Sequence, residues 1–423
     1  MGRRERLRRL DKDLEWNERI QHNGALGVVV LSIEPMGLEA PIEWSLPPSK
    51  SHMIRWLTLA AQAEGDTGLN FIGSAGKDVL SMVDCLREIG AVIDQDESRW
   101  VISGVGSRGF QTPEGNLDCG NSGTAARFLM AIAAGMCEPV SLDGDQSLRR
   151  RDMSALTGAL RELGCEVTSD TLPLTVTGPV VPRSAHLDVS DSSQPLSALL
   201  LASPGYSGAI HLKTSSHSVS RGYSELSYEL AARCGSSNEM VSDDVDIGPW
   251  RPVTPGEVKI PGELSLLPLA MLLAELHDVE VVLTGDGLEL SGSLMELAER
   301  TEELDLRDES DIIAPAAALM ALGNGGRIRG VAHARGKESD RISSTVDLLN
   351  CFGMEATETD GGIEVAGDQT LVRPMLPFDS QGDHRLAMTA MVLASKCGGS
   401  VAGADVCAVS DPDFIEKLMM LED

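Results

Sequence analysis

The sequence has few aromatic residues, a deficit of cations and no long apolar run. Only 3% of its 423 residues are Phe, Trp or Tyr, against 42% hydrophobic residues in all. The core is therefore expected to consist of aliphatic side chains and alanine. No apolar stretch approaches the roughly 18 residues that a membrane span needs. The formal net charge of -29 argues against nucleic acid as a partner, because such binding depends on cationic contacts to phosphate.

The cysteines lack the spacing of a metal site. Eight are scattered along the chain and none forms a CxxC pair, so neither a zinc site nor a disulfide framework is expected, and a reducing cytoplasm fits. GxGxxG and GxxxxGKS motifs are also missing. The first 24 residues combine six Arg with five acids and lack the apolar segment of a signal peptide. They are predicted to be an N-terminal overhang.

One pattern occurs six times: a polar cluster, then a helix rich in Ala and Leu, then a Gly. The markers of the six copies are Lys50, Asn121, Ser192, Glu263, Asp311 and Asp383, at successive spacings of 71, 71, 71, 48 and 72 residues. This regularity indicates an internal repeat of about 70 residues with one abbreviated copy.

A second pattern alternates with the first and combines an amphipathic helix, a turn and a strand. In CLREIGAVI, helical spacing of the apolar residues changes after Gly90 to alternation, which predicts a helix, a glycine cap and a strand. Six such units predict an α/β protein of two similar domains with three units each. The small-residue helices are expected at the centre of each domain, with the sheets outside.

Two segments rich in Pro and Gly divide the chain. The stretch GPWRPVTPGEVKIPGE at 248–263 is predicted to be a linker, and LPPS at 46–49 its counterpart. The chain is therefore expected to cross twice between its domains. This gives the overhang 1–24, a first domain 48–254, and a second domain composed of 25–47 and 261–423.

Cationic and hydroxyl side chains gather at the starts of the small-residue helices. Ser51 and Arg55 are four residues apart and share a helix face, as do Lys337 and Arg341. A single Ser or Asn before a helix is ordinarily a cap. Clusters at matched positions of a repeat instead predict an electropositive cleft for small, highly anionic substrates. The other clusters are Asn121, Thr124 and Arg127; Ser192, Ser193 and Gln194; and His384 with Arg385.

Two acids within this basic set have two interpretations each. Asp311 begins its helix, so it is either an N-cap or a proton-transfer group. Glu338 lies beside Lys337 and near Arg341, so it is either a neutralising partner or a general acid/base. Spacing alone does not separate these interpretations.

Nine motifs in a fixed order now identify a family: PPSKSHMIR, GNSGTAARFL, GDQSLRRRDM, SDSSQPLSALL, SVSRGY, SDIIAPAA, GKESDRI, GDHRLAM and SDPDF. From about residue 25 to its C-terminus, the chain resembles the 5-enolpyruvylshikimate-3-phosphate synthases of the enolpyruvyltransferase family. The resemblance implies two domains, each of three βαβαββ-type repeats with the small-residue helices inside (an inside-out α/β barrel). It also implies a monomeric cytoplasmic enzyme of the shikimate pathway, without metal or cofactor. Such an enzyme transfers the enolpyruvyl group of phosphoenolpyruvate to the 5-hydroxyl of shikimate 3-phosphate and releases phosphate through a tetrahedral intermediate.

The resemblance also implies roles for residues of this chain. Asp311 is the leading general base, Glu338 a proton donor to the methylene carbon, and Lys50 a further group in proton handling. The shikimate 3-phosphate site would comprise Ser51, Arg55, Ser192, Ser193, Ser220, Tyr223, Asp311 and Lys337 in the first domain and at its border. The phosphoenolpyruvate site would comprise Lys50, Gly123, Thr124, Arg151, Gln194, Arg341 and Arg385, the last two clamping the carboxylate from the second domain. His384, beside Arg385, is expected to have a supporting role.

The sequence departs from the family pattern at three places. Val409 replaces a lysine that usually contacts the phosphate of phosphoenolpyruvate. The GDQSLRRRDM loop has Asp152 where proline is common, and two extra cations, Arg149 and Arg150, of which Arg150 is a candidate to compensate for Val409. In the fourth repeat, Glu263 stands where the family has an Asp of its own role.

Two other functions were weighed against this interpretation. The related transferase that acts on UDP-N-acetylglucosamine generally has a cysteine in the loop GDQSLRRRD, and this loop has none. A non-catalytic relative that binds shikimate phosphate as a sensor would fit Val409. It would leave unexplained why both proton-transfer candidates and both clamping arginines are present.

Overall fold

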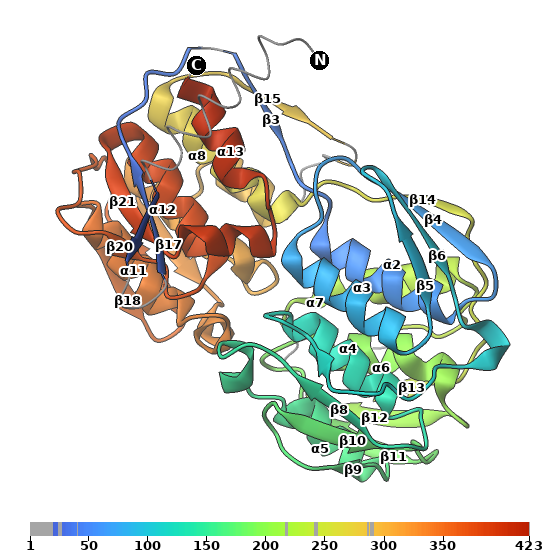
Figure 1. Cartoon of the computed structure of the whole chain (residues 1–423). Coiled ribbons are helices and arrows are strands. Elements are labelled where there is room, and N and C mark those ends of the chain that lie inside the picture. The colour runs from blue at the N-terminus through green and yellow to red at the C-terminus, as the bar shows by residue number, and fades with distance from the viewer. Residues whose placement is uncertain are drawn as a thin grey trace, which may run out of the picture.

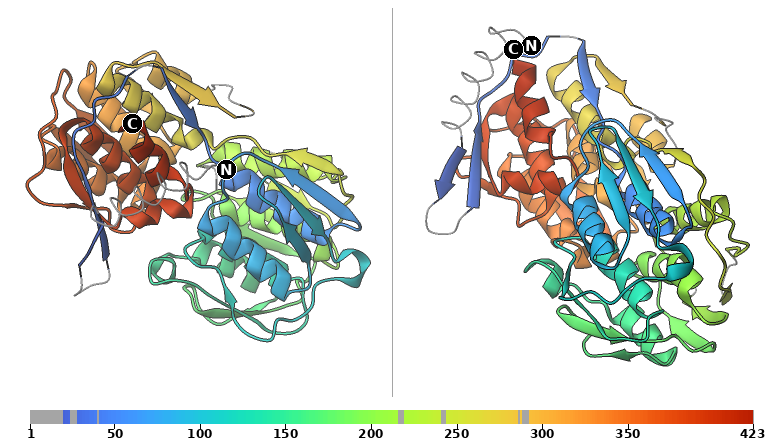
Figure 2. Two further views of the ribbon diagram at one scale, coloured as in Figure 1. Left: turned by 45° about the horizontal axis from the view of Figure 1, so that its top comes forward. Right: turned by 45° about the vertical axis from the view of Figure 1, so that its right-hand side comes forward.

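The computed structural model describes residues 20–23, 28–39, 41–215, 219–240, 244–285, 287 and 292–422. They form two lobes that lie side by side (Figures 1 and 2). Each lobe has its own core of buried apolar side chains. The core of the first lobe runs from Met53 to Ile260, and that of the second combines Leu31 to Leu46 with Leu266 to Leu418. No helix of the described residues is long and apolar enough to cross a membrane.

Six helices rich in small and aliphatic residues occupy the lobe centres, where the six repeats predicted them. In α10, every residue except Leu319 and Leu322 is buried. Their small side chains allow close approach, and α4 packs on α6 while α8 packs on α10 and α12. The six are α2 (Lys50–Gln62), α4 (Gly123–Ala133), α6 (Gln194–Ala202), α8 (Leu267–His277), α10 (Ile313–Leu322) and α12 (His384–Cys397).

The helices of the second pattern are α3 (Lys77–Glu88), α5 (Ser154–Glu162), α7 (Arg221–Arg233), α9 (Ser293–Ala298) and α11 (Arg341–Cys351), and α13 (Phe414–Met419) follows near the C-terminus. The predicted glycine cap after α3 is confirmed, since Gly90 has a φ of 105°. Gly164, Gly235 and Gly353 take the same left-handed conformation after α5, α7 and α11. After α9 this position is Arg300, at a φ of 57°. A strand follows each turn directly, except after α7.

The strands form six sheets on the outside of the helices, which confirms the predicted inside-out α/β class (Figure 1). Each sheet contains one parallel pair of strands, and the four larger sheets extend it with antiparallel neighbours. In the first lobe the sheets are β14 (Glu257–Lys259), β4 (Asp66–Asn70), β6 (Arg99–Ser103), β5 (Val92–Gln95); β7 (Leu117–Asp118), β8 (Val140–Asp143), β10 (Leu174–Thr177), β9 (Glu166–Val167); and β11 (Ser184–Leu187), β12 (Ile210–Thr214), β13 (Asp244–Ile247). In the second lobe they are β3 (Ile42–Ser45), β15 (Val281–Thr284); β16 (Glu303–Asp305), β17 (Gly326–Arg329), β19 (Gly362–Val365), β18 (Ala356–Thr359); and β1 (Ile20–Asn23), β2 (Val28–Ile33), β21 (Gly399–Ala402), β20 (Phe378–Asp379). The two-stranded sheet belongs to the abbreviated repeat.

The chain passes between the lobes twice, and the two crossing segments lie side by side. Strand β3 precedes α2 but pairs with β15, and β14 precedes α8 but pairs with β4. Each crossing therefore falls between a strand and the helix that follows it. The Ser49 amide donates to the Pro261 carbonyl at 2.8 Å, and the Glu263 amide donates to the Pro47 carbonyl at 2.8 Å.

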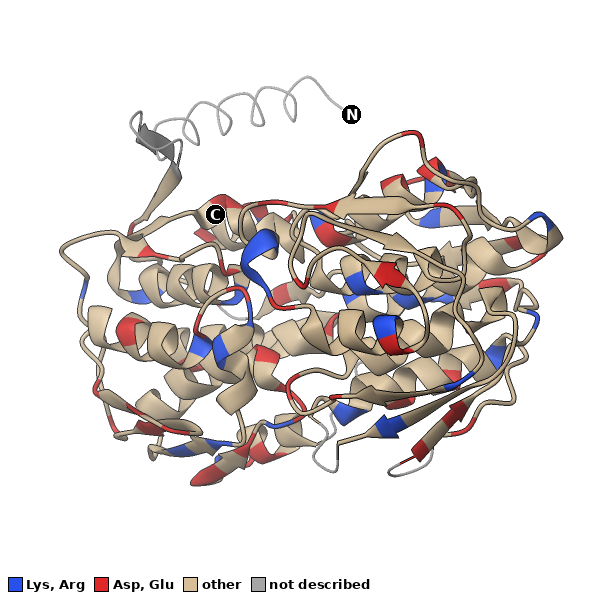
Figure 3. Ribbon diagram, turned by 90° about the horizontal axis from the view of Figure 1, so that it is seen from below, with Lys and Arg blue, Asp and Glu red and all other residues tan. Residues whose placement is uncertain are grey.

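The structure differs from the expected boundaries at two points. Most of the overhang 1–24 lies outside the described residues, but Ile20–Asn23 pair with β2 and so belong to a sheet. The first lobe extends past the expected limit at residue 254, because β14 pairs with β4 and Ile260 is buried in the first core. All eight cysteines carry free thiols. Figure 3 shows acidic and basic residues distributed over both lobes.

Candidate active site

A cleft of about 1050 Å³ lies between the two lobes. The N-termini of α2, α4 and α6 line it from the first lobe. The second lobe contributes the starts of α11 and α12 and the short helices η5 (Ser310–Ile312) and η6 (Ala332–Gly336). Every site residue predicted from the sequence lines the cleft except Arg385. The prediction that the clusters of a repeat converge on one cleft is therefore confirmed.

The sequence positions these helix starts through prolines and short caps. Pro47 and Pro48 precede α2, whose first amide, that of Lys50, donates to Glu263 Oε2 at 3.0 Å. Ser122 Oγ accepts from the Ala125 amide at the start of α4. Asp340 and Asp383 accept backbone amides in the same way at α11 and α12. The Glu263 side chain thus links the second lobe to a helix of the first.

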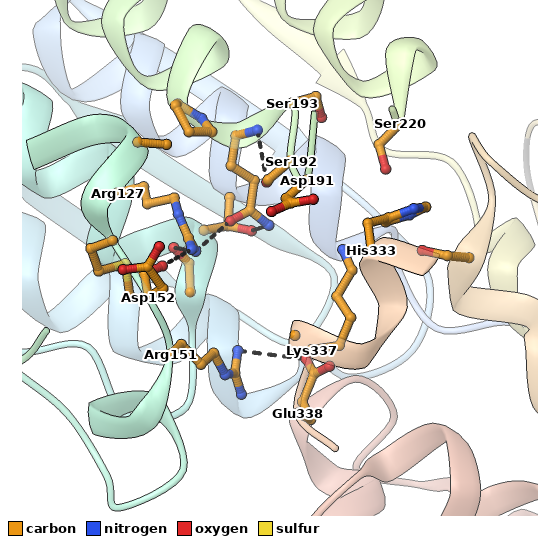
Figure 4. A pocket seen from close by; sticks show the side chains of 18 of the residues that line it. Arg127, Arg151, Asp152, Asp191, Ser192, Ser193, Ser220, His333, Lys337 and Glu338 are labelled. Carbon is orange, nitrogen blue, oxygen red and sulfur yellow. Dashed lines mark hydrogen bonds and ion pairs between the residues drawn. The ribbon is translucent and has the colours of Figure 1, made fainter. Parts of the chain in front are cut away.

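Three serines and a lysine form one end of the cleft. Figure 4 shows Ser192, Ser193 and Ser220 in the first lobe, with Lys337 extending toward them from the second. Ser220 has a left-handed φ of 54°, and its amide donates to the Arg307 carbonyl of the second lobe at 3.2 Å. Burial lowers the pKa of Lys337, against the opposing charge of Asp311. These groups match the needs of a phosphate, which accepts hydrogen bonds and carries negative charge.

Arg55 lies beneath this end of the cleft and is only 2% exposed. Its three guanidinium nitrogens donate to Ser227 Oγ at 2.8 Å, to the Ser51 carbonyl at 3.0 Å and to the Tyr223 carbonyl at 3.0 Å. Burial lowers the pKa of Arg55 to about 10. Within the described part of the chain it has no carboxylate partner, so its positive charge is uncompensated.

The N-terminus of α4 forms a second polar centre around Gly123. A Cβ at Gly123 would lie 2.9 Å from Arg127 Nη1 and 3.2 Å from Arg151 Nη1. Gln194 bridges this centre, accepting from Arg127 Nη1 at 2.8 Å and donating to Thr124 Oγ1 at 3.0 Å. A helix N-terminus beside two guanidinium groups is a favourable place for an anion.

Lys50 pairs with Asp78 across the front of α2 and α3. The Lys50 Nζ to Asp78 Oδ2 distance is 3.1 Å, and Asp78 Oδ1 is buried without a hydrogen-bond partner. Burial alone would lower the pKa of Lys50, but the charge of Asp78 outweighs it and raises that pKa. Lys50 is therefore an ammonium group at neutral pH. Burial raises the pKa of Asp78, opposed by Lys50.

Arg341 connects three carboxylates in the second lobe. Its Nε donates to Asp383 Oδ2 at 2.8 Å, its Nη1 to Asp311 Oδ1 at 2.5 Å and its Nη2 to Glu338 Oε2 at 2.6 Å. Burial would raise the pKa of Asp311, but the charges of Arg341, Arg385 and Lys337 hold it well below its usual range. The pKa of Glu338 is likewise held low by Arg341 and Arg151, against burial. Both acids are therefore ionised at neutral pH.

Arg385 lies behind the cleft wall rather than on it. Its Nη2 donates to Ser265 Oγ at 2.8 Å and lies 3.8 Å from Asp311 Oδ2, and its Nε is buried without a partner. Access to a ligand in the cleft would therefore require the guanidinium to turn away from Ser265.

Three residues of the cleft were not assigned to the site from the sequence. Arg127 was seen in its cluster but without a role, although it holds Gln194. Asp78 stands in the first turn of its helix, where an acid is common and gives no signal. His333 lines the cleft with its Nε2 buried and unpartnered, and burial together with Lys337 lowers its pKa to about 4. Its spacing of four residues from Lys337 was the available clue.

The departures from the family pattern also have structural outcomes. Val409 is 6% exposed and does not line the cleft, and its carbonyl faces Gly76 of the first lobe. Asp152 accepts from Ser154 at the start of α5. Among the described residues, no group of three or more His, Cys, Asp or Glu is placed to hold a metal ion.

Solved structures with the same fold come from enolpyruvyl transfer enzymes. A structure of EPSP synthase from Acinetobacter baumannii has a TM-score of 0.73 to this chain at 23% identity, covering 93% of this chain and 98% of that one. The enolpyruvyl transferase NikO from Streptomyces tendae has a TM-score of 0.65 at 13% identity, covering 93% and 97%. The fold is thus that of the enolpyruvyl transferases.

Sequence comparison narrows this class to one family. The family model described as EPSP synthase (3-phosphoshikimate 1-carboxyvinyltransferase) matches residues 38–225 and 253–418. Proteins named 3-phosphoshikimate 1-carboxyvinyltransferase are 31% identical in Methanocorpusculum labreanum, over 89% of this chain and 94% of the relative, and 33% identical in Novosphingobium aromaticivorans, over 87% and 94%. The chain belongs to the EPSP synthase family.

Proposed function

We propose that this chain transfers the enolpyruvyl group of phosphoenolpyruvate to the 5-hydroxyl of shikimate 3-phosphate and releases phosphate. The observation that carries the proposal is the meeting, in one cleft, of two separate anion-binding centres with two ionised acids between them. Each substrate carries a phosphate and a carboxylate, so the pair needs several cations close together. Family membership supplies the identity of the substrates.

The acceptor, shikimate 3-phosphate, is assigned to the end formed by the serines. Ser192, Ser193, Ser220 and Lys337 would hold its phosphate, and Arg55, with no acidic partner among the described residues, would pair with its carboxylate. Ser51 and Tyr223 lie at the level of the ring. This assignment places the ring beside Asp311, because the Tyr223 hydroxyl donates to Asp311 Oδ2 at 3.4 Å.

The donor, phosphoenolpyruvate, is assigned to the centre at Gly123. Lys50, Arg151, Gln194 and the start of α4 at Gly123 and Thr124 would hold its phosphate. Its carboxylate would go to Arg341 and Arg385, as the resemblance implies. In the structure Asp311 and Glu338 take the donors of Arg341, so the substrate carboxylate would compete with these two side chains.

Asp311 is proposed as the general base that takes the proton of the attacking hydroxyl. An ionised carboxylate is the form that can accept a proton, and the neighbouring cations keep Asp311 in this form. Protonation of the methylene carbon makes C2 electrophilic, the acceptor oxygen bonds to C2, and breaking of the C2–O bond then releases phosphate. The enol ether is restored when a proton leaves the former methylene carbon.

Glu338 is proposed as the group that gives and retrieves the carbon proton. It is ionised in the free protein, since Arg341 and Arg151 hold its pKa low. Substrate anions that engage the same arginines would weaken this effect, so the pKa of Glu338 would rise on binding. The acid would therefore be charged with a proton only when the cleft is filled. Lys50, an ammonium group 3.1 Å from Asp78, would assist in this proton handling.

The proposal also includes the division of the chain into two domains that close around the substrates. The first would span 48 to about 260 and the second 25–47 with 261–423, the former limit of 254 being extended by β14. Monomeric state and a cytoplasmic location remain predictions from the resemblance and the cysteine usage.

Phosphate release from phosphoenolpyruvate by the purified chain tests the proposal. Release that depends on shikimate 3-phosphate would support it. Release that depends only on UDP-N-acetylglucosamine, supplied in parallel, would assign the chain to the related transferase. No release, with shikimate 3-phosphate still bound in calorimetry, would favour the sensor.

A further inference from the structure

The cations that line the cleft fall into two groups. Lys50, Arg151, Arg335 and Arg341 have carboxylate partners within 4 Å. Within the described part of the chain, Arg55, Arg127, Arg150 and Lys337 have none. In a protein of net charge -29, cations without acidic partners are the groups available to substrate anions.

Arg150 differs from the other three because it is exposed and extends from a short helix. Arg55, Arg127 and Lys337 belong to the two anion centres already described. Arg150 ends η2 (Leu148–Arg150), directly before Arg151, whose guanidinium reaches the Gly123 centre. Because consecutive residues are 3.8 Å apart at Cα, the long Arg150 side chain starts close to the proposed donor phosphate.

Arg149, on the other side of Arg150, has a different environment. Its Nε and Nη2 donate to the two carboxylate oxygens of Asp143 at 2.8 and 2.6 Å. It does not line the cleft. The two adjacent arginines therefore carry the same charge but face different surroundings.

Position 409 provides no cation at the donor end. Val409 is buried, and its carbonyl faces Gly76, two residues before Asp78. Asp78 Oδ1 is buried there without a hydrogen-bond partner. The Lys50 end of the cleft therefore contains one carboxylate oxygen more than its cations satisfy.

We propose that Arg150 is a further binding residue for phosphoenolpyruvate, whose phosphate its guanidinium contacts in place of a cation at position 409. The inference rests on the proposed function, since it takes its ligand from there. It makes Arg150 a determinant of donor affinity. The acceptor site and the proton-transfer groups lie outside its reach.

The test compares Arg150→Gln with Arg149→Gln, which removes the same charge one residue away. In steady-state phosphate release, Arg150→Gln is expected to raise the KM for phosphoenolpyruvate about fivefold to tenfold. The KM for shikimate 3-phosphate and kcat should stay within about twofold, as should all constants of Arg149→Gln. Equal effects of the two variants, or a larger effect on the acceptor KM, would overturn the proposal.

Val409→Lys provides a rescue experiment. In the Arg150→Gln background, a lysine at 409 can pair with Asp78 and return a cation to the donor end, so the KM for phosphoenolpyruvate should fall back toward that of the parent. Arg150→Lys, which keeps the charge and the fold, should retain most of the parent affinity. A KM for Arg150→Lys as high as that of Arg150→Gln would contradict a charge-based contact.

Failure of the proposed function has a separate signature. It would appear in the parent protein as no release of phosphate with either acceptor. Titration of phosphoenolpyruvate into the parent and into Arg150→Gln, followed by calorimetry, would then still test Arg150. Equal affinities of the two proteins in that titration would overturn the inference.

Discussion

Arg151 and Glu338 face each other across the cleft, with 3.7 Å between Arg151 Nη1 and Glu338 Oε1 (Figure 4). The first residue belongs to the first lobe and the second to the other, so this ion pair joins the lobes. Arg341 Nη2 approaches the same carboxylate to 2.6 Å. Glu338 is thus a carboxylate whose proton affinity depends on what else its two arginines bind.

Replacement of Glu338 by Gln should therefore affect turnover more than binding. We expect kcat to fall by about 10²- to 10⁴-fold, because the amide cannot give or take a proton. Both KM values should change far less, and steady-state phosphate release measures all three constants. Glu162→Gln, which removes an acid from the outer part of the same cleft, is the control and should behave like the parent. A Glu338→Gln enzyme with near-parental kcat would exclude Glu338 as the proton donor.

Asp311→Asn should separate binding from chemistry at the acceptor site. The asparagine can still meet the Tyr223 hydroxyl and one donor of Arg341, so calorimetry should show shikimate 3-phosphate binding close to that of the parent. Turnover should fall by about 10²- to 10⁴-fold, since the general base is lost. Activity within a few-fold of the parent would remove Asp311 from that role.

Gly123→Ala should weaken binding of the donor. The new Cβ would lie 2.9 Å from Arg127 Nη1 and 3.2 Å from Arg151 Nη1, so both guanidinium groups would have to move from the anion centre. We expect a higher KM for phosphoenolpyruvate and an unchanged KM for shikimate 3-phosphate. Gly115→Ala is the matched control, because a Cβ at Gly115 meets no atom within 4 Å. An unchanged donor KM in Gly123→Ala would place the phosphate elsewhere.

His277 should make stability depend on pH in the second lobe. Burial and the charge of Lys396 lower its pKa to about 4, and its Nε2 lies 2.9 Å from Ser395 Oγ. The unfolded chain therefore takes up a proton near pH 6.5 that the folded chain refuses, so this group costs stability as the pH falls from about 6.5 to 4. Against His277→Gln, the parent should lose melting temperature more steeply over this range. A difference in melting temperature that is constant with pH would contradict the assignment.

The repeat pattern predicted the six central helices and their convergence, because apolar spacing and polar helix starts are local features of a sequence. The abbreviated fourth copy likewise matches the two-stranded sheet of β3 and β15. Partner choice could not be predicted in this way. That β3 pairs with β15 and not beside its own helix α2 follows from the chain crossing between the lobes.

Within the site, the motifs identified the cations but not their state. The paired Lys50–Asp78 and the Arg385 side chain turned toward Ser265 depend on contacts between residues far apart in sequence. Asp78 gave no signal, since an acid in a first helical turn is common. The ionised state of Glu338 also required the structure, because two of its neighbours come from different lobes.

Gly76 gives a test of the contact between the lobes. A Cβ there would collide with the Val409 carbonyl oxygen and lie 2.9 Å from Ser410 Cα, and both are backbone atoms that no rotamer change can move. Gly76 has an ordinary negative φ of -67°, so alanine fits its conformation and only the contact is affected. Gly76→Ala should therefore hold the lobes apart, which would enlarge the radius of gyration in solution scattering with both substrates present. Misplacement of the groups from the two lobes should lower kcat/KM for both substrates by about 10²-fold, while the melting temperature changes little. Parental kinetics in Gly76→Ala would mean that the reactive arrangement does not need this contact.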